Sequence, residues 1–189
     1  MNHTAFFEQV KAGNIAPVYL MEGTEEYIKQ QALSQLCKKL LPQGLEELNL
    51  TELRNPDPDA LIAAAETLPF MADKRLIIVR EHPALTGRAE ADDRLLDYLQ
   101  QVPESCVLVF VCRGKADARK KLYKAVQKHG TVVSFAPLTD AELNAWIVKT
   151  FAGLGKTVSP QTASVLSFTV GSDTALLRRE IEKLSLIHI

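Results

Sequence analysis

The chain has 189 residues, of which 47% are hydrophobic and 24% charged, and its formal net charge at pH 7 is -1. This is the composition of an ordinary globular protein, so it excludes a largely disordered chain, and the length allows one full domain with a smaller second one. The balanced charge excludes an overall basic field for nucleic acid or an anionic membrane, so any such contact must be local.

The first part of the chain alternates between strand and helix patterns. An apolar run over residues 17–21 predicts a strand that ends at the acidic turn, residues 22–26, and the apolar stripe after this turn predicts a helix. Residues 48–53 predict a second strand. A helix is expected over residues 57–66, because an aspartate followed by a proline is a typical helix start.

The middle of the chain continues this alternation and contains its most apolar runs. Residues 74–80 and 106–112 are continuous and β-branched, as in strands buried on both faces of a sheet. Helices are expected over 90–102 and 116–128, and a fifth strand over 131–135. Strands joined by such long connections predict a parallel sheet with right-handed crossovers, and hence a three-layer α/β domain.

The last part of the chain contains helix signals and no strand pattern. Thr139 and Glu142 form the pattern of a capping box, and Ser159 and Ser172 each precede a further helical stretch. The domain boundary is placed near Pro137. We therefore expect an α/β domain over residues 1–137 and a small helical domain over residues 138–189.

Metal, secretion and membrane signals are lacking in the sequence. Cys37, Cys106 and Cys112 do not have the spacing of a zinc site, and the four histidines are scattered, so we expect no metal and no cofactor. The chain has no basic-then-apolar leader and no apolar window approaching about 18 residues. We expect a cytoplasmic protein without a membrane partner.

One motif matches the end of a phosphate-binding loop. Gly155-Lys156-Thr157 is the ending of such a loop, so an active P-loop ATPase that uses these residues is an alternative function. However, the loop needs a further glycine where this chain has Thr150, and it must follow a strand rather than a helix. We favour the alternative that Gly153 and Gly155 end a helix.

A doubly wound sheet would instead bind phosphate at the turn after its first strand. In this chain that acidic turn carries three glutamates and no lysine, so it would repel phosphate. The third strand ends at Arg80-Glu81-His82 without the acidic pair that holds magnesium. Glu81 as an isolated base is less favoured than a solvated carboxylate. We expect no nucleotide-binding and no catalytic residues, and therefore no enzymatic activity from the chain's own residues.

A basic run, residues 113–128, follows the fourth strand and contains seven basic residues against one acidic residue. It offers a possible DNA contact. The candidate contact residues are Arg113, Lys115, Arg119, Lys120 and Lys124. The alternative, which we favour, is the solvated face of a surface helix, because Leu122 and Val126 supply a buried stripe. A DNA-binding module that uses residues 113–128 remains a second alternative function.

The most informative segment is the connector, residues 67–73, between the helix over 57–66 and the third strand. Pro69 disfavours helical backbone at Leu68 and so predicts an extended connector. Leu68, Phe70 and Met71 are unusually large and apolar for a loop. The residues alone leave two alternatives equally open: the connector packs under the domain, or it is exposed and binds a partner.

Three segments together resemble the delta subunit family of the bacterial DNA polymerase III clamp loader. They are residues 18–25, the connector with Lys74 and Arg75, and residues 180–184. The resemblance covers residues 1–184. It implies an AAA+-like domain without ATPase residues, followed by a helical lid domain, in a subunit of a DNA-directed DNA polymerase, a nucleotidyltransferase.

The resemblance also implies a partner and a binding site. In this family the connector docks into the hydrophobic pocket of the sliding clamp, the beta subunit, and helps to open the ring, while other subunits hydrolyse ATP. By matching position, Leu68, Pro69, Phe70 and Met71 would bind the clamp here. DNA would then be reached through the assembled loader.

Family members continue into a third helical domain, the collar that assembles the loader. This chain ends before that domain, and residues 185–189 depart from the family pattern. We therefore expect a truncated, monomeric chain, with the other clamp-loader subunits as partners only of the full-length protein.

Overall fold

A computed structural model describes residues 1–87 and 89–186. The chain divides into two compact units, the first comprising Met1–Phe135 and the second beginning at Ala136. This division lies close to the predicted boundary at residue 137.

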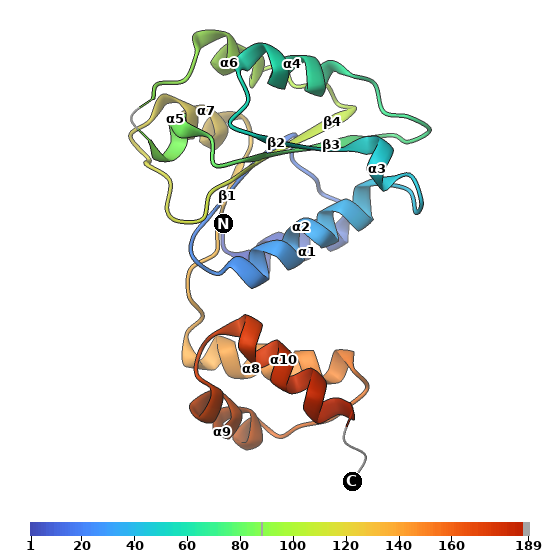
Figure 1. Ribbon diagram of the computed structural model, residues 1–189, viewed down its shortest axis with the longest axis vertical. Helices are drawn as coiled ribbons and strands as arrows, with labels where there is room; N and C mark the ends of the chain where they lie inside the picture. The colour runs from blue at the N-terminus through green and yellow to red at the C-terminus, as the bar shows by residue number, and fades with distance from the viewer. Residues whose placement is uncertain (88, 187–189) are drawn as a thin grey trace. The chain divides into compact units, whose positions relative to one another are not determined.

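The first unit is built on a parallel sheet (Figure 1). Its five strands are β1 (Val18–Glu22), β2 (Leu50–Arg54), β3 (Arg75–Arg80), β4 (Cys106–Val111) and β5 (Thr131–Ser134). They pair in the order β2-β3-β4-β1-β5, and every pairing is parallel. All residues of β1 and β4 are buried, as predicted by the apolar run of each strand, and Glu22 at the end of β1 is buried with them.

Helices cover both faces of this sheet, so the predicted three-layer α/β architecture is confirmed (Figure 1). One face carries α1 (His3–Ala12) and α2 (Glu26–Leu40). The other face carries α4 (Pro58–Glu66), α6 (Asp93–Tyr98) and α7 (Lys121–His129). Two short helices, α3 (Glu46–Asn49) and α5 (Pro83–Thr86), precede β2 and follow β3.

Two helices are shorter than the sequence predicts. The helix expected over 90–102 contains only α6, because Asp92 caps its start and tight turns follow it at Gln100 and Gln101. The helix expected from residue 116 begins only at Lys121. The reason is that the Ala116 N–H donates to the Glu22 carboxylate, which holds this segment as a loop.

Other differences lie near the N-terminus and before β2. The prediction missed α1, which begins at the cap Asn2 and buries Phe6 and Val10 one helical turn apart. The second strand was expected to begin at residue 48, but residues 48 and 49 complete α3 and the strand begins at Leu50.

The second unit is a small bundle of helices, as predicted. Its described helices are α8 (Asp140–Gly153), α9 (Pro160–Val170) and α10 (Thr174–Leu186). Its core comprises Leu143, Ile147, Phe151, Ala163, Leu177 and Ile181. The predicted capping box is confirmed, because Thr139 accepts from the Glu142 backbone and Glu142 accepts from the Thr139 backbone. Residues 187–189, which belong to the departing tail, lie outside the described part.

None of the helices in the described residues is both long and apolar enough to cross a bilayer.

Candidate functional site

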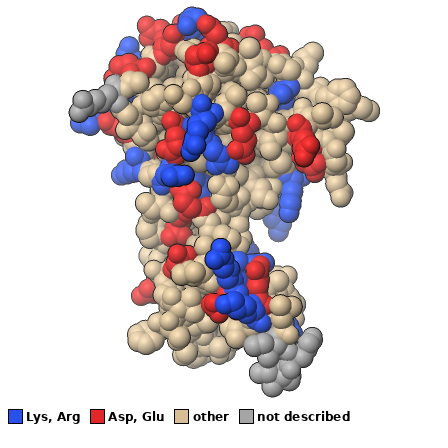
Figure 2. Space-filling model, in the orientation of Figure 1, with Lys and Arg blue, Asp and Glu red and all other residues tan. Residues whose placement is uncertain are grey.

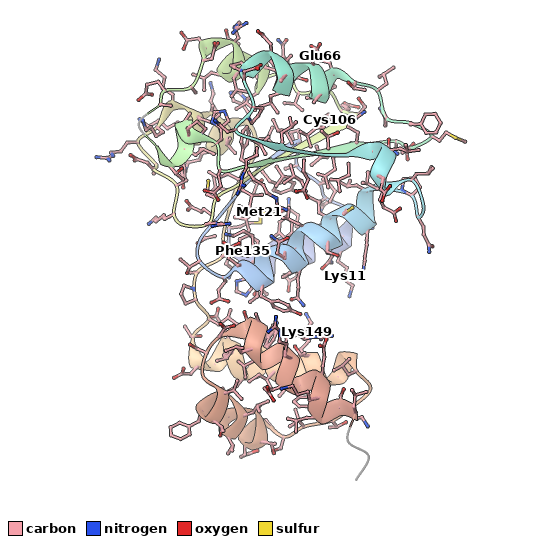
Figure 3. The ribbon with its side chains drawn as sticks, viewed as in Figure 1. Lys11, Met21, Glu66, Cys106, Phe135 and Lys149 are labelled. Atoms are coloured by element: carbon pink, nitrogen blue, oxygen red, sulfur yellow. The ribbon has the colours of Figure 1, made fainter. Side chains whose placement is uncertain are left out.

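The connector leaves α4 at Glu66 (Figure 3) and exposes its large apolar side chains. Leu68 and Met71 are each 77% exposed, and Phe70 is 55% exposed. The connector therefore does not pack its large apolar side chains under the domain, which was the first of the two alternatives left open by the sequence. Fully burying a side chain of this size stabilises a protein by about 1.5 to 3 kcal/mol. Because these side chains are exposed, most of this stabilisation is not realised within the described chain.

The backbone of the connector is fixed by Asn49, a fully buried residue at the end of α3. The Phe70 N–H donates to Asn49 Oδ1 at 2.7 Å, and Asn49 Nδ2 donates to the Phe70 carbonyl at 3.0 Å. Nδ2 also donates to the Leu45 carbonyl at 3.1 Å. One side chain therefore satisfies both backbone groups of Phe70.

Two further features shape the connector. Arg75, at the start of β3, donates through Nη2 to Thr51 Oγ1 at 3.0 Å and through Nη1 to the Leu68 carbonyl at 3.4 Å. Met71 adopts a left-handed conformation with φ 50°, which is uncommon for a residue other than glycine. Sequence reasoning found the apolar residues but not Asn49, whose bonding partner lies 21 residues away.

The acidic turn lies at the carboxyl end of β1 and is closed by protein contacts. The Gly23 N–H donates to the Gly114 carbonyl at 2.9 Å, and the Phe135 N–H donates to the Glu22 carbonyl at 2.7 Å. Gly23 has φ 114°, and a Cβ at this position would lie 2.2 Å from the Phe135 carbonyl oxygen. The backbone of Phe135, the residue that follows β5, thus occupies the space next to this glycine.

A lysine that the sequence analysis did not consider reaches into this turn. Lys29, in the first turns of α2, is fully buried. Its Nζ donates to the Cys112 carbonyl at 2.6 Å, to the Gly23 carbonyl at 2.7 Å and to the Glu26 carboxylate at 2.7 Å. The description of the turn as carboxylates without a lysine is therefore incomplete. The ammonium group is present, but its three N–H groups already donate hydrogen bonds to protein oxygens.

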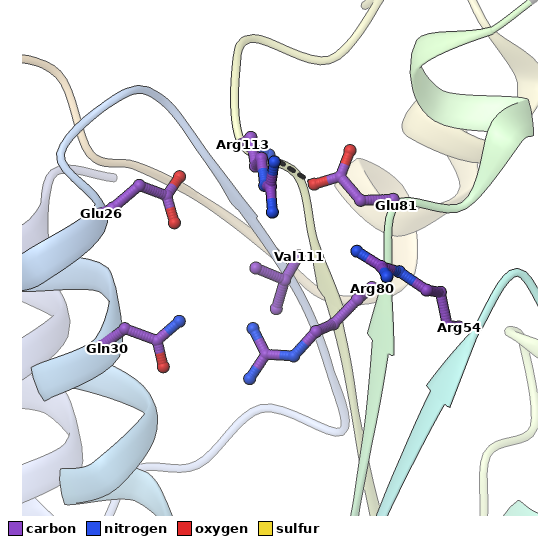
Figure 4. Close-up of a pocket in the computed structure, with 7 residues that line it drawn as sticks. All are labelled: Glu26, Gln30, Arg54, Arg80, Glu81, Val111 and Arg113. Carbon is purple, nitrogen blue, oxygen red and sulfur yellow. Dashed lines mark hydrogen bonds between the residues drawn. The ribbon is translucent and has the colours of Figure 1, made fainter.

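A small hollow of about 110 Å³ lies beside this turn, at the carboxyl ends of β2, β3 and β4 (Figure 4). Its lining residues are Glu26, Gln30, Arg54, Arg80, Glu81, Val111 and Arg113. Arg80 is bound by both carboxylate oxygens of Glu52, at 2.9 and 3.2 Å, and these hydrogen bonds raise its pKa. Glu81 accepts from the Arg113 N–H at 2.9 Å.

This hollow lacks the donor set of a magnesium-nucleotide site. Its two carboxylates come from α2 and from the end of β3, and each already accepts a hydrogen bond. Within residues 1–87 and 89–186, no group of three or more His, Cys, Asp and Glu side chains is arranged to hold a metal ion.

The Gly155-Lys156-Thr157 motif lies at the end of α8. The Gly155 N–H donates to the Ala152 carbonyl at 3.0 Å, and the Lys156 N–H donates to the Phe151 carbonyl at 3.0 Å. These bonds satisfy carbonyls of the last helical turn. The motif therefore ends a helix, as favoured above, and does not join a strand to a helix.

The basic run is partly neutralised by acidic neighbours. Lys120 Nζ lies 3.0 Å from Glu90, and Arg119 Nη2 lies 2.9 Å from Asp117. The hydrogen bonds that Arg119 donates to Asp117 lower the pKa of this carboxyl group to about 2. Lys121 lies 3.6 Å from Asp93. The remaining candidate residues Arg113, Lys115 and Lys124 are exposed. Lys and Arg side chains are interspersed with Asp and Glu on the face shown in Figure 2.

The cysteines are free thiols. Burial raises the pKa of Cys106, which is labelled in Figure 3, to about 11 and that of Cys112 to about 12. Burial also raises the pKa of the half-buried Cys37. A thiol whose pKa is raised is less often ionised at neutral pH and is therefore a poorer nucleophile, so none of these three cysteines is an activated one.

The fold is shared with solved structures of AAA+ proteins. The RuvB Holliday junction branch migration motor of Thermotoga maritima matches with a TM-score of 0.54 and 11% identity, over 96% of this chain and 58% of that chain. Domain III of the replication initiation protein DnaA from Thermotoga maritima matches with a TM-score of 0.52 and 15% identity, over 96% of this chain and 80% of that chain. The chain thus has an AAA+-like fold, in which an α/β domain is followed by a helical unit.

Closer relatives define the family. The family model described as DNA polymerase III, delta subunit, matches residues 19–136. DNA polymerase III subunit delta of Bacillus subtilis (strain 168) is 30% identical over 187 residues, which is 94% of this chain and 54% of that protein. The solved structure of the Bacillus subtilis DNA clamp loader delta protein matches with a TM-score of 0.80 and 30% identity, over 97% of this chain and 57% of that chain. The chain belongs to the DNA polymerase III delta subunit family, and it spans just over half the length of these two relatives.

Proposed function

We propose that this chain acts as a clamp loader delta subunit, which binds the sliding clamp through Leu68, Pro69, Phe70 and Met71 and helps to open it for loading onto primed DNA. The observation that carries the proposal is the connector, which exposes three large apolar side chains on a backbone fixed by hydrogen bonds. A fixed backbone lowers the entropic cost of binding, because less conformational freedom remains to be lost. As a replication component, the protein is proposed to act in the cytoplasm.

The direct test is a pull-down of the chain against a purified bacterial sliding clamp. We expect capture of the clamp, because the exposed apolar side chains match a hydrophobic pocket on the partner. Failure to retain the clamp at micromolar concentrations of both proteins would count against the proposal.

ATP with magnesium is expected neither to bind nor to be hydrolysed by this chain. The acidic turn repels phosphate, and the ammonium of Lys29, which contacts this turn, is already bound to three protein oxygens. Isothermal titration calorimetry with ATP and magnesium should therefore show no heat of binding. A dissociation constant in the micromolar range that is lost in Lys156→Ala would support the P-loop ATPase alternative instead.

Within this proposal, ATP hydrolysis is supplied by other loader subunits, and DNA is reached through the assembled loader. The ion pairs of Arg119, Lys120 and Lys121 support the interpretation of the basic run as a solvated face rather than an independent DNA-binding module. Exposed ion pairs of this kind contribute little to stability and are screened by salt.

A further inference from the structure

We infer that Asn49 positions the connector for its partner, so that this buried amide acts on clamp affinity without touching the clamp. The inference rests on the proposed function, since it assumes that the connector is the binding segment. Asn49 stands at the end of α3, and its side chain is fully buried. It bonds to the backbone of Phe70, the residue at the centre of the exposed apolar group.

Asn49 uses its oxygen acceptor and both of its N–H donors in hydrogen bonds. An amide side chain has one oxygen acceptor and two N–H donors. Here the oxygen accepts from the Phe70 N–H, and the nitrogen donates to the carbonyls of Phe70 and Leu45. Asn49 therefore pairs with Phe70 as a neighbouring strand would, although the connector lies outside the sheet.

The hydrogen bonds from Asn49 restrain the conformation of the connector, which has few other stabilising contacts. Leu68, Phe70 and Met71 point their side chains to solvent and receive little packing from the first unit. Met71 also adopts a left-handed backbone conformation, which neighbouring contacts must maintain. The Arg75 contact to the Leu68 carbonyl is long, at 3.4 Å, so the two short bonds from Asn49 are the principal restraint.

Removing the amide should lower the population of the binding-competent connector while leaving its apolar side chains intact. An apparent dissociation constant rises in proportion as the competent fraction falls. We expect Asn49→Ala to weaken clamp binding by about tenfold to a hundredfold. The loss should appear mainly in the association rate constant, whereas Phe70→Ala, which removes an anchor, should mainly raise the dissociation rate constant.

The experiment compares the parent, Asn49→Ala, Phe70→Ala and the control Val10→Ala by surface plasmon resonance on an immobilised sliding clamp. Val10 is fully buried in α1, which packs against α2 and β5, at the edge of the sheet opposite to β2. Val10→Ala should lower the melting temperature but keep the parent's affinity. This control separates general destabilisation from a specific effect on the connector.

Amide hydrogen exchange gives a readout that needs no clamp. In the parent, the Phe70 amide should exchange more slowly than the amides of Ala72 and Asp73, because its N–H is bonded to a buried oxygen. In Asn49→Ala this protection should disappear while the protection of the sheet is retained. Should Asn49→Ala fail to fold, Asn49→Ser replaces it, because the serine side chain is one bond shorter and has one donor where the amide has two.

The outcomes separate the two proposals. If the parent binds the clamp and the connector variants do not, parent-like affinity in Asn49→Ala overturns the positioning role alone. Rapid exchange of the Phe70 amide in the parent also overturns it. If the parent fails to bind the clamp, the proposed function fails, whereas the exchange measurement still decides whether Asn49 holds the connector.

Discussion

Clamp binding is expected to fall by about two to four decades when Leu68 and Phe70 are both replaced with alanine. Burying each side chain in a partner pocket contributes about 1.5 to 3 kcal/mol, so losing both costs roughly 3 to 6 kcal/mol of binding free energy. The melting temperature should stay close to that of the parent, because the two side chains are 77% and 55% exposed. Calorimetric titration against the clamp and thermal melting together measure both quantities.

A matched control uses exposed apolar residues in the second unit. Val165 and Phe168 of α9 are 64% and 92% exposed, so Val165→Ala with Phe168→Ala removes a similar apolar surface from a different place. This control should bind the clamp as the parent does. Unchanged clamp affinity in the Leu68→Ala, Phe70→Ala variant would show that the connector is not the binding segment, and a much lower melting temperature would show that it belongs to the core.

Gly23→Ala is expected to cause a large loss of stability, of about 3 to 5 kcal/mol. Two costs combine at this position, because φ is 114° and the new methyl group would lie 2.2 Å from the Phe135 carbonyl oxygen. Neither the turn nor Phe135 can move away without breaking the hydrogen bonds that join them, from the Phe135 N–H to the Glu22 carbonyl and from the Glu25 N–H to the Phe135 carbonyl. Thermal unfolding should show a melting temperature lowered by roughly 10 to 20 °C.

Gly44→Ala separates the free-energy cost of the positive φ from that of the steric clash. Gly44 also has a positive φ, of 85°, but a Cβ there meets no atom within 4 Å. Its substitution should cost only about 1 kcal/mol, which is the conformational penalty without the clash. If the two variants lost equal stability, the close approach of Phe135 to Gly23 would not matter, and the account of the closed turn would have to be withdrawn.

Much of the fold could be predicted because its signals are local. The apolar residues of β4 and the capping box at Thr139 and Glu142 lie within a few positions of one another, so short-range patterns were enough. The late start of the helix expected over 116–128 was different. It depends on a bond between Ala116 and Glu22, which lie 94 residues apart, and no local pattern indicates such a bond.

The candidate site shows the same division. The connector was found from its composition, since three large apolar residues beside a proline are conspicuous in a loop. Asn49 and Lys29 were missed, because each acts through contacts with segments distant in sequence. An isolated asparagine or lysine gives no sign in the sequence that it is fully buried, and residues of these types are mostly exposed.

Because the native thiols Cys106 and Cys112 are buried, a cysteine introduced in the connector can be labelled selectively. With pKa values of about 11 and about 12, Cys106 and Cys112 are ionised at neutral pH in on the order of one molecule in ten thousand or fewer. A cysteine introduced by Met71→Cys would be exposed and should react with a maleimide dye well before them. With Cys37 replaced by serine, such a dye would report the arrival of a partner at the connector directly, by a change in its fluorescence.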